Sequence, residues 1–343
     1  MEKLFIRKLI LMTSVLFKNA INKKPQSTPP IWFMRQAGRY HKHYNKLKEK
    51  YSFETLCKTP DLAAEVANGP IEEFDFDIAI LFSDILFILE GLGLNLKFNP
   101  GPKFQQSINK ENFHLFNDIN KAIEHMSFQK QALEITKEKI SKSKSLIGFV
   151  GGPWTLLTYA LGKKGKNFEL QDYQLQFLKE TLLPLLKLNI KLQLNAGAEI
   201  VMIFDSNLYD LDQTTFELEY YNILSNIAEE FPNKIGFYSR GKKLHELKSI
   251  FKIPFAGIGF DHTINLNKIF ESNLRGFVQG NFNEQLMLLD KDNFNKELDY
   301  YITEMKKIEN RDGWICGLGH GINKMTPERN VHLFIENIRK SFS

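Results

Sequence analysis

Cysteine is almost absent from this sequence of 343 residues. The two cysteines, Cys57 and Cys316, lie far apart and form neither a Cys-x-x-Cys pair nor a Cys/His spacing typical of a metal site. A disulfide framework is therefore excluded. The cysteine usage fits a reducing compartment, and we expect a cytoplasmic protein without a bound metal ion.

Long apolar runs and blocks of basic residues are lacking as well. No apolar run reaches the roughly 18 residues that a membrane-spanning helix requires. The net charge of +5 comes from scattered lysines, without the interleaved aromatic residues typical of nucleic-acid binders. The composition, 43% hydrophobic and 25% charged, is that of an ordinary globular protein. We therefore expect no membrane and no nucleic-acid partner.

The N-terminus carries basic residues followed by an apolar stretch at residues 9–17, which superficially resembles a signal peptide. No small-residue cleavage site follows this stretch. We favour a frayed amphipathic helix, or translation that begins at Met12, over export. The expected organisation is an N-terminal extension at residues 1–24 and one domain at residues 25–343.

Eight short apolar runs rich in β-branched residues recur along the chain, nearly all separated by segments of helical periodicity. They cover residues 31–35, 78–83, 146–150, 199–204, 234–238, 255–259, 276–279 and 314–318. Helices are predicted at residues 60–74 and 326–338, each with proline near its first position. This alternation predicts an α/β fold, a single (β/α)8 (TIM-like) barrel with its active site at the C-terminal ends of the strands.

Polar functional groups follow seven of the eight predicted strands. The residues at these strand ends are Arg35, Asp84, Gly151-Gly152-Pro153, Asp205-Ser206, Arg240, Asp261, Asn281 and His320. Barrel enzymes build their sites from these ends, and solubility alone does not explain so regular a recurrence. The pattern therefore favours an enzyme.

Residues 29–40, PPIWFMRQAGRY, place Arg35 and Arg39 four positions apart, with a glycine turn between them. The planar guanidinium matches the edge of a carboxylate and stays charged, so arginine suits the bidentate binding of carboxylates. Pairing with an acidic neighbour is the structural alternative, and the nearest acids in the sequence are Glu49 and Glu54. Taken alone, the motif predicts an anion-binding site.

This stretch resembles the N-terminal signature of the uroporphyrinogen decarboxylase family. The resemblance continues through LCKTPDLAAEV at 56–66, AILFSDIL at 79–86, GFVGGPWTL at 148–156, IFDS at 203–206, VQGN at 278–281 and GLGHGI at 317–322. It implies a distorted (β/α)8 barrel that removes CO2 from the four acetate side chains of uroporphyrinogen III, giving coproporphyrinogen III in porphyrin and haem biosynthesis. It also implies that no cofactor is used and that the enzyme is a homodimer.

The resemblance implies a role for each matching site residue. Loss of CO2 leaves a carbanion, and protonation of the attached pyrrole creates the cationic system that accepts its electrons. A carboxylate at position 84 would stabilise that cation, an electrostatic contribution often large in catalysis. Asp84, Arg35 and Arg39 are the implied catalytic residues, and the implied substrate-binding residues are Arg35, Gln36, Ala37, Gly38, Arg39, Asp84, Tyr159, Ser206 and His320.

The sequence departs from the family's common residues at several positions outside these motifs. His41-Lys42-His43 replaces Leu-Pro-Glu after the arginine motif, His262 replaces a tryptophan, and Asn281-Phe-Asn-Glu284 replaces Asn-Leu-Asp-Pro. We expect the first change to alter affinity rather than chemistry.

Two rival functions have different requirements. A zinc-dependent methyltransferase on the same barrel, acting on a thiol and a corrinoid, needs a His-x-Cys pair after the fifth strand, where this chain has Tyr238-Ser239-Arg240. A non-catalytic tetrapyrrole carrier would keep the arginines and have no use for Asp84.

Overall fold

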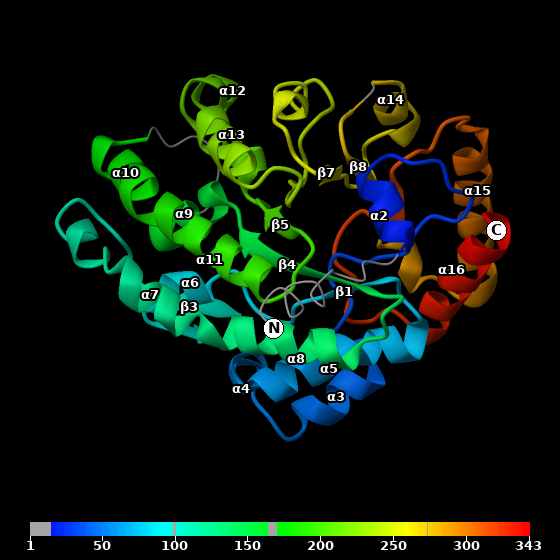
Figure 1. The fold of residues 1–343 in the computed structure, drawn as a ribbon, viewed down its shortest axis with the longest axis horizontal. Coiled ribbons are helices and arrows are strands. Elements are labelled where there is room, and N and C mark those ends of the chain that lie inside the picture. Colours follow the sequence, from blue (N-terminus) through cyan, green and yellow to red (C-terminus); the bar gives the residue numbers. More distant parts are fainter. Residues whose placement is uncertain (1–14, 99–100, 164–169, 273) are drawn as a thin grey trace, which may run out of the picture.

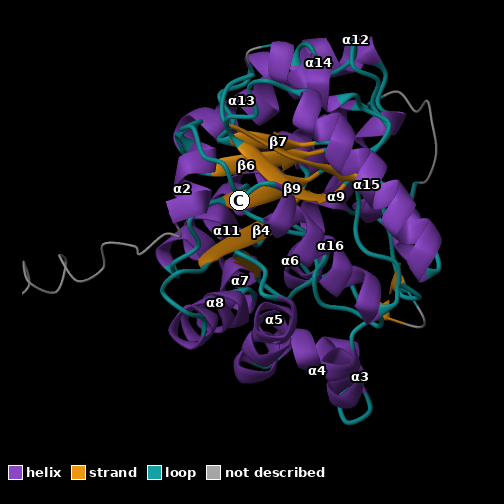
Figure 2. Ribbon diagram, turned by 90° about the vertical axis from the view of Figure 1, so that its right-hand side faces the viewer, coloured by secondary structure: helices purple, strands orange, loops and turns teal. Residues whose placement is uncertain are grey.

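The centre of the molecule is a curled sheet of seven parallel strands, a half-barrel surrounded by helices (Figures 1 and 2). The computed structural model describes residues 15–98, 101–163, 170–272 and 274–343. The strands of the sheet, in spatial order, are β1 (Ile78–Ile80), β4 (Ser145–Gly151), β5 (Val201–Phe204), β6 (Ile235–Tyr238), β7 (Gly257–Gly259), β8 (Phe277–Phe282) and β9 (Trp314–Leu318). A separate antiparallel pair consists of β2 (Leu96–Phe98) and β3 (Pro102–Phe104).

Helices connect the strands and cover the outside of the sheet (Figure 2). They are α2 (Val15–Ile21), α3 (Lys42–Lys48), α4 (Phe53–Lys58), α5 (Pro60–Phe74), α6 (Phe87–Gly91), α7 (Ile119–His125), α8 (Ser127–Lys139), α9 (Pro153–Ala160), α10 (Asp172–Phe177), α11 (Leu183–Asn195), α12 (Gln213–Thr215), α13 (Tyr221–Glu230), α14 (Leu266–Glu271), α15 (Lys291–Lys307) and α16 (Glu328–Ser341). Short 3-10 segments lie at Phe113–Leu115, Leu208–Asp210, Ile250–Lys252 and Leu286–Leu288, and π-helical turns at Leu178–Leu182 and Phe216–Tyr220.

The sheet is buried on both sides, as expected for parallel strands between helices and a filled interior. Nearly every residue of the seven strands is buried. Glycine allows the closest packing: a Cβ at Gly257 would lie 2.1 Å from Cγ of Phe277 on the next strand. The bulky phenylalanine therefore occupies the space that Gly257 leaves free.

The prediction of an eighth strand at residues 31–35 is wrong beyond its first residue. Only Ile31 forms a bridge, in parallel with Cys316 of β9. Pro29 and Pro30 have no backbone N–H to donate, so a ladder cannot extend backwards from Ile31. After Ile31 the chain turns into a loop, and the N–H of Phe33 points to the side-chain Oε1 of Gln36 at 3.5 Å.

The short segment around Ile31 nevertheless contacts both edges of the sheet, at β9 and next to β1. On one side Trp32 N donates to Cys316 O at 2.9 Å, and Cys316 N donates to Pro30 O at 2.9 Å. On the other side Asp77 N donates to Ile31 O at 3.1 Å, and Ile31 N donates to Oδ2 of Asp77 at 2.7 Å. Asp77 directly precedes β1. The segment thus connects the first and last strands of the half-barrel.

The other predicted strands and helices are confirmed, most of them with different first or last residues. The strand predicted at 78–83 ends at Ile80, whereas the helix predicted at 60–74 is α5 with the same bounds. The helix predicted at 326–338 begins at Glu328. Within the predicted N-terminal extension, α2 buries Phe17 and Ala20, while residues 1–14 lie outside the described part of the chain.

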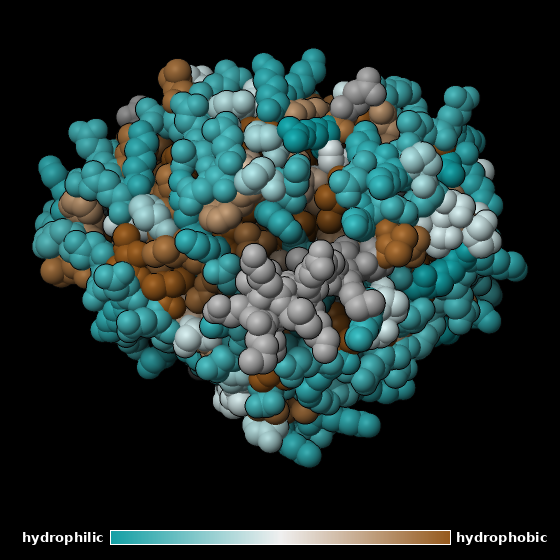
Figure 3. Space-filling view, viewed as in Figure 1, coloured by the Kyte–Doolittle hydropathy of each residue, from teal (hydrophilic) through white to brown (hydrophobic). Residues whose placement is uncertain are grey.

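One face of the molecule is shown in Figure 3, coloured by hydropathy. In Figure 3, hydrophilic side chains cover most of the visible face, and apolar ones gather at the left, about where α9 and α11 lie in Figure 1. In the part of the chain that the structure describes, no helix combines the length and the apolar character needed to cross a membrane.

Replacing Asp77 with Ala should destabilise the fold, because the buried N–H of Ile31 loses its acceptor and Arg339 loses a partner at 3.3 Å. An unsatisfied buried donor costs about 1–3 kcal/mol, which urea unfolding would measure. The control is Asp75→Asn. Asp75 also pairs with Arg339 but is 67% exposed, so its replacement should cost less than about 1 kcal/mol. Asparagine tolerates the left-handed conformation (φ 61°) at this position. Equal losses in the two variants would contradict the role given to Asp77.

Candidate active site

The loop after Ile31 carries two exposed arginines. Arg35 and Arg39 both lie on the surface, and within the described residues neither guanidinium has a hydrogen bond or an ion pair with an acidic side chain. The alternative that Glu49 or Glu54 neutralises them is therefore not what the structure shows. Two charged groups with no acidic partner in the described part of the chain are available to an anionic ligand.

The arginine loop is held from behind. The Tyr40 hydroxyl donates to the backbone oxygen of Gln36 inside the loop, and Lys42 N, at the start of α3, donates to Oε1 of Glu328 at 2.6 Å. Lys42 Nζ also pairs with Glu328 at 3.3 Å. Glu328 is the first residue of α16, so the C-terminal helix fixes the end of the arginine loop.

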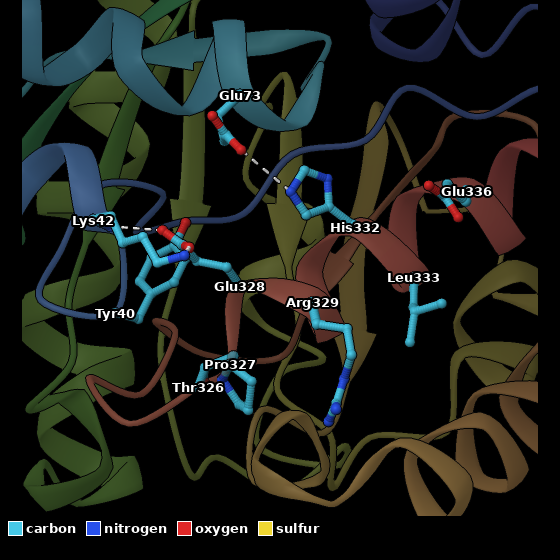
Figure 4. Close-up of a pocket in the computed structure, with 10 residues that line it drawn as sticks. All are labelled: Tyr40, Lys42, Glu73, Thr326, Pro327, Glu328, Arg329, His332, Leu333 and Glu336. Carbon is cyan, nitrogen blue, oxygen red and sulfur yellow. Dashed lines mark hydrogen bonds and ion pairs between the residues drawn. The ribbon is translucent and has the colours of Figure 1, made fainter.

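Tyr40, Lys42 and Glu328, which anchor the loop, also line a surface pocket of about 610 Å³ (Figure 4). The close-up shows the ion pair between Lys42 and Glu328 and a second pair between Glu73 and His332, which are 3.4 Å apart. None of the predicted catalytic residues lines this pocket. We therefore interpret it as the joint between α3, α5 and α16, and not as the catalytic cleft.

Asp84 lies in the connection between β1 and α6. Its Oδ1 accepts a hydrogen bond from Leu86 N at 2.9 Å, a local turn that leads into the helix. This bond occupies one oxygen of Asp84 but does not cap α6, whose N-cap residue is Leu86. No bond to Oδ2 is found among the described residues, so this oxygen is available to a ligand. Burial raises the pKa of the Asp84 carboxyl above its ordinary value, against the opposing effects of Leu86 N–H and Arg35.

Arg35 interacts electrostatically with both Asp84 and His320. Its positive charge acts to lower the pKa of both groups. Gly321 packs against the arginine: a Cβ at this position would lie 3.3 Å from Cβ of Arg35 and 3.4 Å from its Nε. The glycine after His320 therefore lets the arginine loop lie close to the end of β9.

Tyr159 brings a hydroxyl to the same place from α9. It is the only half-buried residue of a helix that is otherwise buried. Burial, and next the negative charge of Asp84, raise the pKa of its hydroxyl. Electrostatic interactions thus connect Asp84 with Arg35 and with Tyr159, and Arg35 with His320, across four separate segments of the chain.

His320 is held by Tyr238 of β6. The tyrosine hydroxyl lies 3.0 Å from Nδ1 of His320 and 2.9 Å from the backbone oxygen of Gly319, and the two rings stack. Burial, followed by the charge of Arg240, lowers the pKa of His320 to about 4. The imidazole is therefore neutral at physiological pH and can donate or accept one hydrogen bond through Nε2, depending on its tautomer.

The remaining predicted site residues are placed less directly. Ser206 is half-buried just after β5, and no contact connects it to Asp84 or the arginines. Its neighbour Asn207 donates from Nδ2 to Thr158 of α9 at 2.9 Å, which puts Ser206 near the helix that carries Tyr159. Gln36 is buried, and its Nε2 has no partner among the described atoms. Ala37 and Gly38 are half-buried in the turn before Arg39.

Three of the polar groups at predicted strand ends hold loops and do not face a ligand. Asp205 is fully buried and accepts hydrogen bonds from Thr155 and from the Tyr220 hydroxyl. Asp261 accepts from Gly241 N at 2.7 Å and from Thr263. Asn281 lies within β8 and donates to the backbone oxygens of Asp261 and Ile264. Their recurrence at the strand ends therefore reflects in part the anchoring of the loops.

Sequence reasoning missed a charged group beside His320. Glu284 is buried, and its carboxylate lies 3.9 Å from Nη2 of Arg240 and 3.4 Å from Nδ1 of His262. His262 and Glu284 are two of the positions at which the sequence departs from the family's common residues. The sequence indicated only that an ionisable side chain stands at each of these two positions. The separation of residues 262 and 284 along the chain does not predict that they are in contact.

Comparisons with known proteins agree on the family. The family model described as uroporphyrinogen decarboxylase (URO-D) matches residues 12–341. Uroporphyrinogen decarboxylase from Orientia tsutsugamushi (strain Ikeda) is 35% identical, and the match covers 94% of this chain and 98% of that protein. The enzyme of the same name from Vesicomyosocius okutanii is 34% identical and is covered over 95% of its length, with 93% of this chain. A solved methyltransferase from Methanosarcina mazei shares the fold, with a TM-score of 0.80 and 16% identity over 97% of this chain and 99% of its own.

His320 should stay neutral until the pH approaches 4. Because the ordinary pKa of histidine is 6.5 and that of folded His320 is about 4, the unfolded chain binds more protons between these values. This contribution to stability is complete above pH 6.5 and is lost as the pH falls towards 4. NMR titration of the imidazole, assigned with a His320→Asn variant, measures the midpoint. A midpoint at or above pH 6 would contradict the buried environment described here.

Proposed function

Because the chain belongs to the uroporphyrinogen decarboxylase family, we propose that the residues which follow β1 and β9 bind uroporphyrinogen III. The enzyme is a decarboxylase of haem biosynthesis. The reaction converts the four acetate side chains to methyl groups and yields coproporphyrinogen III. The assignment of the site is supported by the packing of Gly321, next to His320, against Arg35 and by the electrostatic interactions that connect Arg35, Asp84, Tyr159 and His320.

Asp84 stabilises the cation that forms during the reaction. Protonation of a pyrrole ring makes it an electron sink, and the electron pair of the breaking C–C bond flows into it as CO2 leaves. A carboxylate oxygen next to the ring can accept the pyrrole N–H bonds and stabilise the positive charge. Oδ2 of Asp84 has no bond within the described residues, whereas Oδ1 is held by Leu86 N, so the group is fixed in position and still available.

Arg35 and Arg39 orient the substrate through its carboxylates. Within the described residues neither guanidinium forms an ion pair or hydrogen bond with an acidic side chain, although the charge of Arg35 acts on Asp84 from a longer distance, and the loop that carries the arginines is anchored by Tyr40 and Glu328. Charge-assisted bonds to carboxylates are among the strong polar interactions in proteins. In this proposal both arginines serve catalysis by binding carboxylates of the substrate so that a pyrrole ring lies next to Asp84.

Three further residues contribute hydrogen bonds to the substrate. The charge of Asp84 acts on the Tyr159 hydroxyl, and Ser206 offers a hydroxyl from the end of β5. His320 donates to a propionate from Nε2 in the tautomer in which Nδ1 accepts from the Tyr238 hydroxyl. Gln36, Ala37 and Gly38 form the turn between the arginines and shape the site at this point.

The wider assembly is part of the same proposal. The segment around Ile31 takes the place of an eighth strand and closes the half-barrel, which its hydrogen bonds to Asp77 and Cys316 support. The resemblance to the family supports a homodimer, and two buried free thiols, those of Cys57 and Cys316, are consistent with the cytoplasm.

Nothing in the site favours the methyltransferase alternative. Cys316 is fully buried inside β9, and burial raises the pKa of its thiol, so it is not presented as a thiolate ligand at the strand ends. The described residues contain no group of three His, Cys, Asp or Glu side chains placed to hold a metal ion. The Methanosarcina mazei structure is only 16% identical to this chain, so the similarity concerns the fold alone.

Replacing Asp84 with Asn should lower kcat by about 10²–10³-fold, the effect of removing one electrostatic stabiliser of a transition state. KM should change little, because the arginines still bind the substrate. The assay is anaerobic incubation with uroporphyrinogen III, followed by chromatography of the oxidised products with seven to four carboxylates. The exposed Asp75→Asn variant serves as control. Nearly intact turnover in Asp84→Asn would refute the mechanism, and no stepwise loss of carboxylates with the unmodified enzyme would refute the function.

Replacing Arg39 with Ala should mainly raise KM. The loss of a charge-assisted hydrogen bond costs about 1.5–3 kcal/mol, which corresponds to roughly 10–150-fold in affinity. Arg39→Lys should recover part of this loss, since it restores the charge without the planar fork. Steady-state kinetics with uroporphyrinogen III distinguish the two variants. Unchanged KM in both would show that Arg39 does not contact the substrate.

A further inference from the structure

Arg240 is a third exposed arginine near the proposed site. It follows a strand in the middle of the sheet, whereas Arg35 and Arg39 follow the segment at the edge next to β9. Arg240 comes two residues after the end of β6. In the sheet, β7, β8 and β9 lie between β6 and the bridge at Ile31. His320, which follows β9, therefore stands between Arg240 and Arg35 along the rim of the half-barrel.

Arg240 is held in place yet keeps most of its donors free. Its side chain is 49% exposed, and its only described polar contact is with Oε1 of Glu284, at 3.9 Å. This distance permits attraction between the charges but is too long for a hydrogen bond. A guanidinium has five N–H donors, so Arg240 can still bind a carboxylate with two of them.

Glu284 explains why the arginine stays near the rim. Its carboxylate is only 3% exposed, and one of its oxygens, Oε2, has no hydrogen-bond partner in the described structure. A buried carboxylate requires nearby positive charge. Arg240 supplies this charge from β6, and His262 lies 3.4 Å away on the other side.

The turn that follows Arg240 is also fixed. Gly241 N donates to the buried carboxylate of Asp261 at 2.7 Å, and Gly241 has a positive φ of 73° that favours glycine. On the same strand, Tyr238 holds His320 at 3.0 Å. Strand β6 therefore places both the support of His320 and the guanidinium of Arg240 at one edge of the proposed site. The charge of Arg240 also affects His320 more strongly than that of Arg35 does.

We propose that Arg240 is a further substrate-binding residue, which takes a peripheral carboxylate of the tetrapyrrole on the far side of His320 from Arg35 and Arg39. This inference rests on the proposed function. A macrocycle with carboxylates around its whole edge cannot be oriented by the two arginines of one loop alone. A cation on a different strand, fixed by a buried carboxylate, determines the rotation of the ring relative to Asp84.

The test compares Arg240→Ala with Arg275→Ala, an exposed arginine that precedes β8 at the opposite end of the sheet. Arg240→Ala should raise KM for uroporphyrinogen III about tenfold or more, as expected for a charge-assisted bond to a carboxylate, with kcat within about threefold. Arg240→Lys should recover part of the affinity, and Arg275→Ala should leave KM unchanged. The difference between Arg240→Ala and the unmodified enzyme should shrink as salt is raised.

Thermal unfolding separates binding from a merely structural role. If Arg240 only neutralises Glu284, Arg240→Ala will lower Tm while KM stays that of the unmodified enzyme, and the inference is overturned. Should the alanine variant not fold, Arg240→Gln keeps the polar stem without the charge and is judged by the same KM criterion. An unmodified enzyme that does not decarboxylate uroporphyrinogen III would refute the proposed function itself, whereas normal turnover with unchanged KM in the Arg240 variants refutes this inference alone.

Discussion

The site depends on one small set of hydrogen bonds, those that hold the segment around Ile31 between Asp77 and Cys316. Parallel strands leave donors and acceptors unpaired at both edges of an open sheet, and unpaired buried backbone groups are costly. The segment around Ile31 satisfies some of these groups on both edges. Because the arginine loop begins at the next residue, the same bonds determine where Arg35 and Arg39 are presented.

A second dependence is electrostatic. The arginine loop brings positive charge to a half-buried carboxylate and to a histidine that burial keeps neutral. A neutral imidazole adds no further cation to a site already crowded with guanidinium groups, so it can form a hydrogen bond to a substrate without repelling its neighbours. The buried Glu284 then offsets part of the positive charge at the other side of the rim. This distribution suits a ligand with many carboxylates and one ring that becomes cationic.

The sequence predicted the seven strands of the sheet and the bounds of α5, because apolar runs and caps are local signals. It failed at residues 32–35, where an apolar run forms a loop and only Ile31 bridges to β9. The polar residues at the strand ends could be found from the sequence, but those that bind a ligand could not be distinguished from those that anchor a loop. Whether Asp205 binds a ligand or anchors a helix depends on Thr155 and Tyr220, which only the folded chain brings to it. For the same reason the contact between Glu284 and Arg240 could not be foreseen.

The link between Lys42 and Glu328 joins residues 286 positions apart in the sequence. During synthesis the arginine loop leaves the ribosome among the first parts of the chain, but its anchors, Cys316 and Glu328, are among the last. Contacts of such long range form late in folding, since the intervening chain must be ordered first. A nascent chain therefore exposes its arginine motif long before the motif can take its final position, and a chain truncated before β9 would carry the whole signature of the site without the site.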